Sequence, residues 1–133
     1  MTHEPPLPTE GELRLLRVLW QRGPSTVREV LDALPGGGDT GYTTALKLLQ
    51  IMHAKGLVIR DETNRTHVYA AAVPPESTQR RLVADLVERA FGGSAHQLVL
   101  QALSPQLASP AELAQIRALL DTLGTGDRPE EEG

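Results

Sequence analysis

Three polar side chains recur along the stretch GYTTALKLLQIMHAKGL, residues 41–57. Thr43, Lys47 and Gln50 are spaced four and three residues apart, which places them on one side of a helix with 3.6 residues per turn. A hydroxyl, a cation and an amide are groups that contact the phosphates and base edges of duplex DNA. A similar stripe is expected on the solvent face of any helix that packs on a core, so periodicity alone leaves both interpretations open.

The remaining positions of this stretch are mostly apolar. The side opposite the polar stripe carries Ala45, Leu48, Leu49 and Met52, and Leu46 and Ile51 lie on the flanks. Thr44 falls between the two faces, where it could cap the helix or contact a phosphate. Gly56 stands where a left-handed residue commonly ends a helix.

The net charge of −4 is unevenly distributed along the 133 residues. Residues 1–75 hold eight Lys/Arg and eight Asp/Glu, whereas residues 76–133 hold five and nine. DNA-binding domains are commonly basic, so DNA binding by this chain must depend on local placement of charge. No acidic residue occurs from position 40 to position 60. The cations in and after this region form a modest basic cluster: Lys47, Lys55, Arg60 and Arg65.

Two further helices are predicted before this stretch. Residues 9–12 and 26–29 both have the T-x-x-E spacing of a capping box, and each is followed by leucines or valines at helical spacing. Gly23-Pro24 should end the first helix. The second should end before the glycine run at residues 36–38, which is expected to form a flexible loop.

A β-hairpin is predicted after the third helix. Residues 57–60 and 66–70 are rich in β-branched or aromatic side chains, and the polar residues 61–65 between them form a turn. Three helices followed by a hairpin is the order of a winged helix-turn-helix, whose third helix enters the major groove while the hairpin flanks it. The fold class is therefore mainly α with a small β-hairpin wing.

Pro74-Pro75 separates this part from a second half that is predicted to be all helical. The expected division is a disordered N-terminus at 1–8, a winged-helix DNA-binding domain at 9–74, a helical dimerisation domain at 75–124 and a disordered acidic tail at 125–133. The last helix begins at Ser109-Pro110-Ala111-Glu112, an N-terminal signature, and Gly124 is expected to close it.

The apolar side chains of the second half exceed what a few short helices can bury among themselves. Exposed patches of this kind usually mark association sites, which favours an isologous homodimer. Few phosphates could be neutralised by one subunit, and a dimer on two half-sites doubles that number. The residues expected at the dimer interface are Leu82, Leu86, Leu98, Val99, Leu103, Ile116 and Leu120.

The joint order of several short segments resembles the BlaI/MecI/CopY family of bacterial repressors, which includes the penicillinase repressors. The segments are 16–20 (LRVLW), 26–30 (TVREV), 42–44 (YTT), 55–58 (KGLV), 68–69 (VY), 91–94 (FGGS) and 98–99 (LV). The resemblance covers residues 9–123. It implies a winged-helix domain followed by a helical dimerisation domain, and repression of transcription from a palindromic DNA operator.

The resemblance also implies roles for individual residues. Thr43, Thr44 and Lys47 match recognition-helix contacts, and Arg65 and His67 match wing contacts. Gln50 is a candidate for a different reason: it lies on the same helix face as Thr43 and Lys47, and its side chain is able to read an adenine. Some family members are inactivated by a regulatory protease that cuts an Asn-Phe bond after Val-Leu. The matching pair here is Gln101-Ala102, which departs from that cleavage site.

Other function classes find little support in the sequence. Nucleophile, P-loop and dinucleotide motifs are absent, so an enzyme is not expected and no cofactor is predicted. The four histidines show no metal-ligand spacing, and the chain has no cysteine for a thiolate site or the copper-responsive mechanism. No apolar run could span a membrane, and a cytoplasmic location is expected. The alternative function is a winged-helix protein–protein interaction module that does not bind DNA directly.

Overall fold

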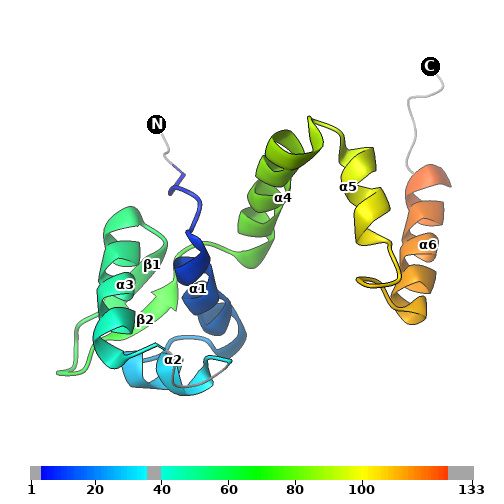
Figure 1. Ribbon diagram of the computed structural model, residues 1–133. Coiled ribbons are helices and arrows are strands. Elements are labelled where there is room, and N and C mark those ends of the chain that lie inside the picture. Colours follow the sequence, from blue (N-terminus) through cyan, green and yellow to red (C-terminus); the bar gives the residue numbers. More distant parts are fainter. Residues whose placement is uncertain (1–3, 36–39, 126–133) are drawn as a thin grey trace. The chain divides into compact units, whose positions relative to one another are not determined.

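The computed structural model describes residues 4–35 and 40–125 (Figure 1). Its elements are α1 (Glu10–Arg22), α2 (Val27–Ala33), α3 (Tyr42–Lys55), β1 (Val58–Asp61), β2 (Val68–Ala71), α4 (Pro75–Phe91), α5 (Ala95–Ala102) and α6 (Pro110–Thr125). The prediction of a mainly helical chain with one hairpin is confirmed. The predicted loop at 36–38 and nearly all of the predicted acidic tail lie outside the described residues.

The chain divides into two compact units, Met1–Ala84 and Asp85–Gly133. The division falls within α4, ten residues beyond the Pro74-Pro75 boundary expected from the sequence. Residues 4–8, expected to be disordered, make contacts in the first unit. Arg81 donates a hydrogen bond from Nη1 to the carbonyl oxygen of Pro5 at 2.9 Å, and Pro8 is buried.

Capping boxes begin the first two helices, as their sequences predict. In α1, the Thr9 hydroxyl accepts from the backbone N–H of Glu12, and the Glu12 carboxylate accepts from the backbone N–H of Thr9. Thr26 and Glu29 repeat this arrangement in α2. Each box satisfies two backbone donors that the first helical turn leaves unpaired.

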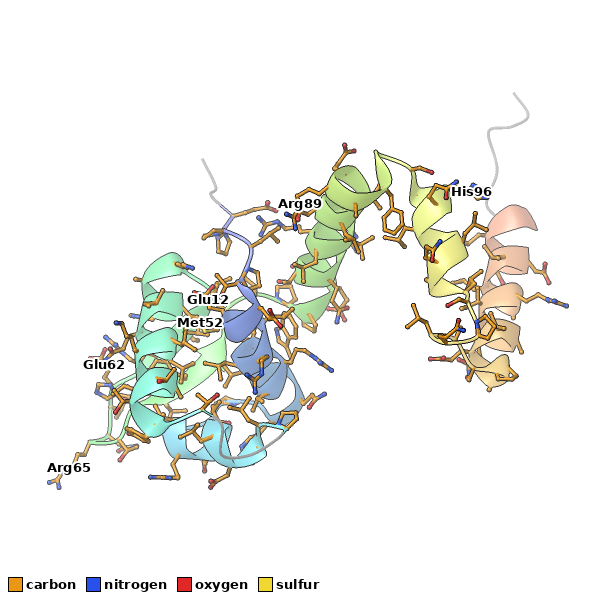
Figure 2. The ribbon with its side chains drawn as sticks, viewed as in Figure 1. Glu12, Met52, Glu62, Arg65, Arg89 and His96 are labelled. Atoms are coloured by element: carbon orange, nitrogen blue, oxygen red, sulfur yellow. The ribbon has the colours of Figure 1, made fainter. Side chains whose placement is uncertain are left out.

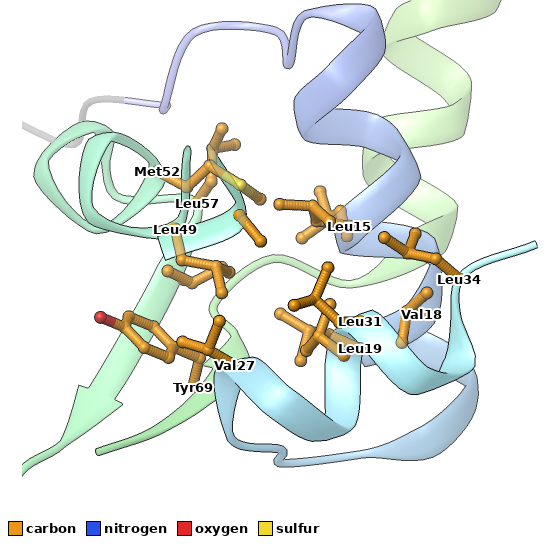
Figure 3. Close-up of a cluster of buried hydrophobic side chains, with 14 residues drawn as sticks. Leu15, Val18, Leu19, Val27, Leu31, Leu34, Leu49, Met52, Leu57 and Tyr69 are labelled. Carbon is orange, nitrogen blue, oxygen red and sulfur yellow. The ribbon is translucent and has the colours of Figure 1, made fainter. Parts of the chain in front are cut away.

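The core of the first unit forms where α1, α2, α3 and the hairpin meet (Figure 3). Ala45, Leu49 and Met52 of α3 have no exposed surface, which confirms the predicted core side of this helix. Leu48 is only partly buried at the margin of the core. The other members of the core are Leu15, Leu16, Val18, Leu19, Val27, Val30, Leu31, Leu34, Leu57, Val58 and Tyr69.

Gly56 ends α3 in the left-handed conformation, with φ 86° and ψ 10°, and turns the chain into the hairpin. The two strands pair antiparallel with Val58 opposite Ala71 and Asp61 opposite Val68. Both strands therefore end one residue later than expected. Ser25, just before α2, adds a bridge that the sequence did not indicate: it exchanges two 2.8 Å backbone hydrogen bonds with Tyr69. This bridge fixes β2 to the α1–α2 turn.

A buried ion pair joins the start of α1 to the end of α3. The Nζ atom of Lys55 lies 2.7 Å from Oε2 of Glu12, whose side chain is 2% exposed. Burial acts to raise the pKa of Glu12, but the hydrogen bonds and charge of Lys55 and the bonds from Thr9 outweigh it, so the pKa is lowered from 4.5. The sequence predicted the capping role of Glu12 but not its burial or its pairing, because Lys55 is 43 positions away.

We expect Lys55→Met to lower the free energy of unfolding by about 1–3 kcal/mol, because a buried carboxylate would lose its cation. The lower end allows for the exposure of the Lys55 side chain, which is 31%. Glu12→Gln should cost less, since glutamine keeps the capping box and leaves only a partly exposed ammonium group unpaired. Urea unfolding of both single variants and the double variant gives the coupling energy, and strictly additive costs would contradict the pairing.

The stability that Glu12 contributes through its charge should also depend on pH. Because its folded-state pKa is lowered, this contribution is complete above the unfolded value near 4.5 and is lost as the pH falls through the folded value. The stability difference between wild type and Glu12→Gln should therefore shrink below pH 4.5. A difference that stays constant across this window would show that the charge of Glu12 is not involved.

The second unit has almost no interior of its own. Gly92 and Gly93, both with positive φ, end α4, and Ser94 caps α5 by accepting from the backbone N–H of Gln97. Ser109 and Glu112 form the predicted box at the start of α6. The helix continues through Gly124 to Thr125, so the prediction that Gly124 closes it was wrong. Ala108 is the one buried residue among positions 85–124.

Candidate nucleic-acid interface

The polar stripe of α3 is exposed along its length. Thr43, Thr44, Lys47 and Gln50 are all exposed to solvent. Thr44 lies at the edge of the stripe, and the other three lie on the side of the helix away from the buried Ala45, Leu49 and Met52. Thr44 does not cap the helix, because Gly41 is the N-cap residue and no side chain bonds there. Four side chains able to donate hydrogen bonds therefore lie along the exposed surface of α3.

A hollow of about 370 Å³ lies between α2, α3 and the hairpin. The hollow is lined by Thr26, Val27, Arg28, Tyr42, Leu46, Gln50, Arg60, Arg65, Thr66, His67 and Tyr69. It brings together Gln50, Arg65 and His67 from the predicted site. The other three, Thr43, Thr44 and Lys47, lie on α3 outside the lining. Arg65 stands at the tip of the hairpin loop and points away from the body of the domain (Figure 2), while His67 is partly buried.

The predicted basic cluster is smaller than the sequence suggested. Lys55 is paired with the buried Glu12, and the Nε atom of Arg60 lies 2.6 Å from Oε2 of Glu62. A hydrogen bond with Tyr69 and the bond to Glu62 raise the pKa of Arg60. The guanidinium group is therefore charged, but it is already bound to Glu62. Within the described residues, Lys47 and Arg65 form no ion pair.

One cation at this surface, Arg28, was not predicted from the sequence. The guanidinium carbon of Arg28, on α2, lies 5.4 Å from the centre of the Tyr42 ring at the start of α3. Arg28 is exposed and lines the hollow with Gln50 and Arg65. The available signal was its position on α2, where Val27, Val30 and Leu31 face the core and leave Arg28 on the outer side.

The described residues contain no group of three or more His, Cys, Asp or Glu side chains that could hold a metal ion. In the same part of the chain, none of the helices is long and apolar enough to cross a membrane.

Three helices followed by an antiparallel hairpin, with a polar stripe exposed on the third helix, define a winged helix-turn-helix DNA-binding domain. A family model described as penicillinase repressor matches residues 8–122. The chain belongs to this family, and it is a DNA-binding transcriptional repressor. Transcriptional repressors are not a class of enzyme.

Two curated relatives and one solved structure illustrate the similarity. The transcriptional regulator BlaI of Mycobacterium tuberculosis is 32% identical over 113 residues, with 84% of this chain and 82% of that protein covered. An uncharacterized 16.5 kDa protein from the ptsI 3′ region of Latilactobacillus sakei is 24% identical over 112 residues, covering 84% and 77%. The solution structure of the DNA binding domain of the repressor BlaI is 20% identical with a TM-score of 0.48, covering 56% of this chain and 90% of that one.

We expect Glu62→Gln to strengthen binding to duplex DNA, because the variant would free Arg60 to contact a phosphate. Fluorescence anisotropy with a labelled random-sequence duplex should show tighter binding and a steeper dependence of log K on log salt, by up to ~0.9 for each phosphate gained per subunit. Asp61→Asn is the matched control. It also removes an acidic charge from the hairpin, but Asp61 accepts from the backbone N–H of Thr63 and does not hold Arg60. Equal effects of the two variants would contradict a specific release of Arg60.

Proposed function

We propose that this repressor binds a palindromic operator as a homodimer, with α3 of each subunit in the major groove and the hairpin against the flanking backbone. The observation that carries the proposal is the exposed polar stripe of α3. Thr43, Lys47 and Gln50 project outward on a helix whose opposite face packs into the core, in a stretch without acidic residues. A protein that acts on chromosomal DNA of a bacterium would work in the cytoplasm.

The contacts divide into two kinds. Lys47 and Arg65 supply positive charge for phosphates, which gives affinity without reading sequence. Gln50 can accept from and donate to the edge of an adenine, and Thr43 and Thr44 can bond to either a base or a phosphate. His67, on the hairpin side of the hollow, would contact the backbone next to Arg65.

The homodimer is supported by the incomplete burial of the second unit. Of the residues predicted at the interface, Leu86, Val99 and Leu120 are 44%, 42% and 56% exposed, and Leu98, Leu103 and Ile116 are only partly buried. Leu82 is partly buried too, but it lies in the part of α4 that belongs to the first unit. Leu107, Leu119 and Leu123 are each more than half exposed as well. Helices with this much exposed apolar surface gain free energy by covering it, at about 25 cal/mol for each Å² removed from water.

Cleavage by a regulatory protease stays a prediction, and only the family resemblance suggests it. Gln101 and Ala102 are exposed at the end of α5. Both differ from the Asn-Phe pair of the cleaved family members, so we do not assign this bond as a cleavage site.

Lys47→Ala and Arg65→Ala should each weaken binding to duplex DNA and lower the salt slope by ~0.9 for each contacted phosphate in a subunit. Arg17→Ala is the control, because it removes an exposed cation of α1 that does not line the hollow. Anisotropy titrations over a range of salt concentrations measure both quantities, with circular dichroism to verify folding. If wild type shows no affinity for duplex DNA and no salt slope, the protein-interaction alternative is favoured instead.

Leu120→Glu should shift the protein from dimer toward monomer, because a carboxylate would be buried without a partner in the interface. Gln115→Glu introduces the same charge on α6 at a position that is already polar, and it should leave the dimer intact. Multi-angle light scattering at micromolar concentration measures the mass of each. A monomeric wild type under these conditions would remove the two-half-site proposal.

A further inference from the structure

The outer side of α2 carries a cation that lies outside the contacts described so far. Arg28 is exposed, and its guanidinium group lies over the Tyr42 ring at a distance of 5.4 Å, within the range of a cation–π contact. Its acidic neighbour Glu29 is already engaged, because Oε1 accepts from Thr26 and Oε2 lies 3.6 Å from Arg22. Asp32, one turn further along α2, forms no ion pair in the described part of the chain.

We propose that Arg28, oriented by Tyr42, contacts a DNA phosphate next to the start of α3. This inference rests on the proposed binding of DNA by α3. In a helix-turn-helix the helix before the recognition helix crosses the phosphate backbone, and here that helix is α2. Arg28 thus stands where a backbone strand would pass, and it lines the same hollow as Arg65 of the hairpin.

Tyr42 has a defined part in this arrangement. The residue begins α3 directly before Thr43 and is 45% exposed. A cation–π contact does not use the N–H donors of the guanidinium group as hydrogen-bond partners, so they stay available for a phosphate. The contact also restricts a long side chain before DNA arrives, which reduces the conformational entropy lost on binding. Tyr42 is therefore a positioning residue, and Arg28 makes the contact.

This assignment changes the charge of the interface. The sequence pointed to Lys55 and Arg60 as part of the basic cluster, and both are held by carboxylates. Arg28 supplies a cation from a third element, so that Arg28 of α2, Lys47 of α3 and Arg65 of the hairpin carry positive charge from three directions. Phosphate contacts from three separate elements would fix the orientation of the domain on the duplex.

The test uses the full chain and a labelled random-sequence duplex, titrated at several salt concentrations. Arg28→Gln should weaken binding roughly tenfold near 0.1 M salt and reduce the salt slope by ~0.9 per subunit, as expected for one lost phosphate. Tyr42→Phe keeps the ring and should bind as wild type does. Tyr42→Leu should weaken binding about two- to fivefold, the range that a cation–π contact can supply. Arg17→Gln is the control for loss of a positive charge elsewhere in the domain.

Each result either supports or overturns the inference. A wild-type slope for Arg28→Gln, together with a reduced slope for Lys47→Ala, overturns the role of Arg28 and leaves DNA binding by α3 intact. Equal losses for Tyr42→Phe and Tyr42→Leu overturn the stacking, because they would assign the effect to the hydroxyl group. Absence of salt-dependent binding by wild type overturns the proposed function and this inference together. Circular dichroism and thermal unfolding verify that the variants fold.

Discussion

The direction of the polar stripe depends on how α3 is seated in the core. Ala45, Leu49 and Met52 have no exposed surface, and they pack against side chains of α1, α2 and the hairpin (Figure 3). Rotating the helix by one position would expose the two larger side chains, at a cost of about 1.5–3 kcal/mol each. The same packing that stabilises the fold therefore holds Thr43, Lys47 and Gln50 outward before DNA is present. The Glu12–Lys55 pair fixes the end of α3 to the start of α1, and the Ser25–Tyr69 bridge fixes β2 to the turn before α2.

Features encoded within a few residues could be predicted from the sequence. The capping boxes of α1 and α2, the left-handed Gly56 and the outward face of α3 each follow from local spacing, because a helix repeats every 3.6 residues and its caps lie next to it. The strand ends were displaced by one residue, since short apolar runs do not define where pairing stops. Gly124 did not end α6, because it adopts no left-handed conformation there and the helix continues.

Contacts between distant residues could not be predicted in this way. Lys55 and Glu12 are 43 positions apart, so their pairing could not be predicted, and Lys55 was expected to be a cation available to DNA. Arg60 is a different case, because the carboxylate that binds it belongs to Glu62, only two residues further along the chain, and the spacing alone does not show that the two side chains pair. Arg28 was missed because its partner Tyr42 lies on the next helix. The interface that emerges has few cations, placed on different elements, and this agrees with a chain whose net charge is negative.

Each copy of the chain presents few cations and would contact few phosphates by itself. The proposed mode of DNA binding therefore depends on dimerisation through the second unit. Two subunits related by a two-fold axis would place two copies of α3 on the duplex, and their operator would carry the same symmetry. Selection of bound sequences from a random duplex library by the full-length protein tests this most directly. A two-fold symmetric dimer should select an inverted repeat with half-site centres about 10 base pairs apart, or a multiple of that spacing. Enrichment of a single unrepeated motif, or no enrichment at all, would contradict it.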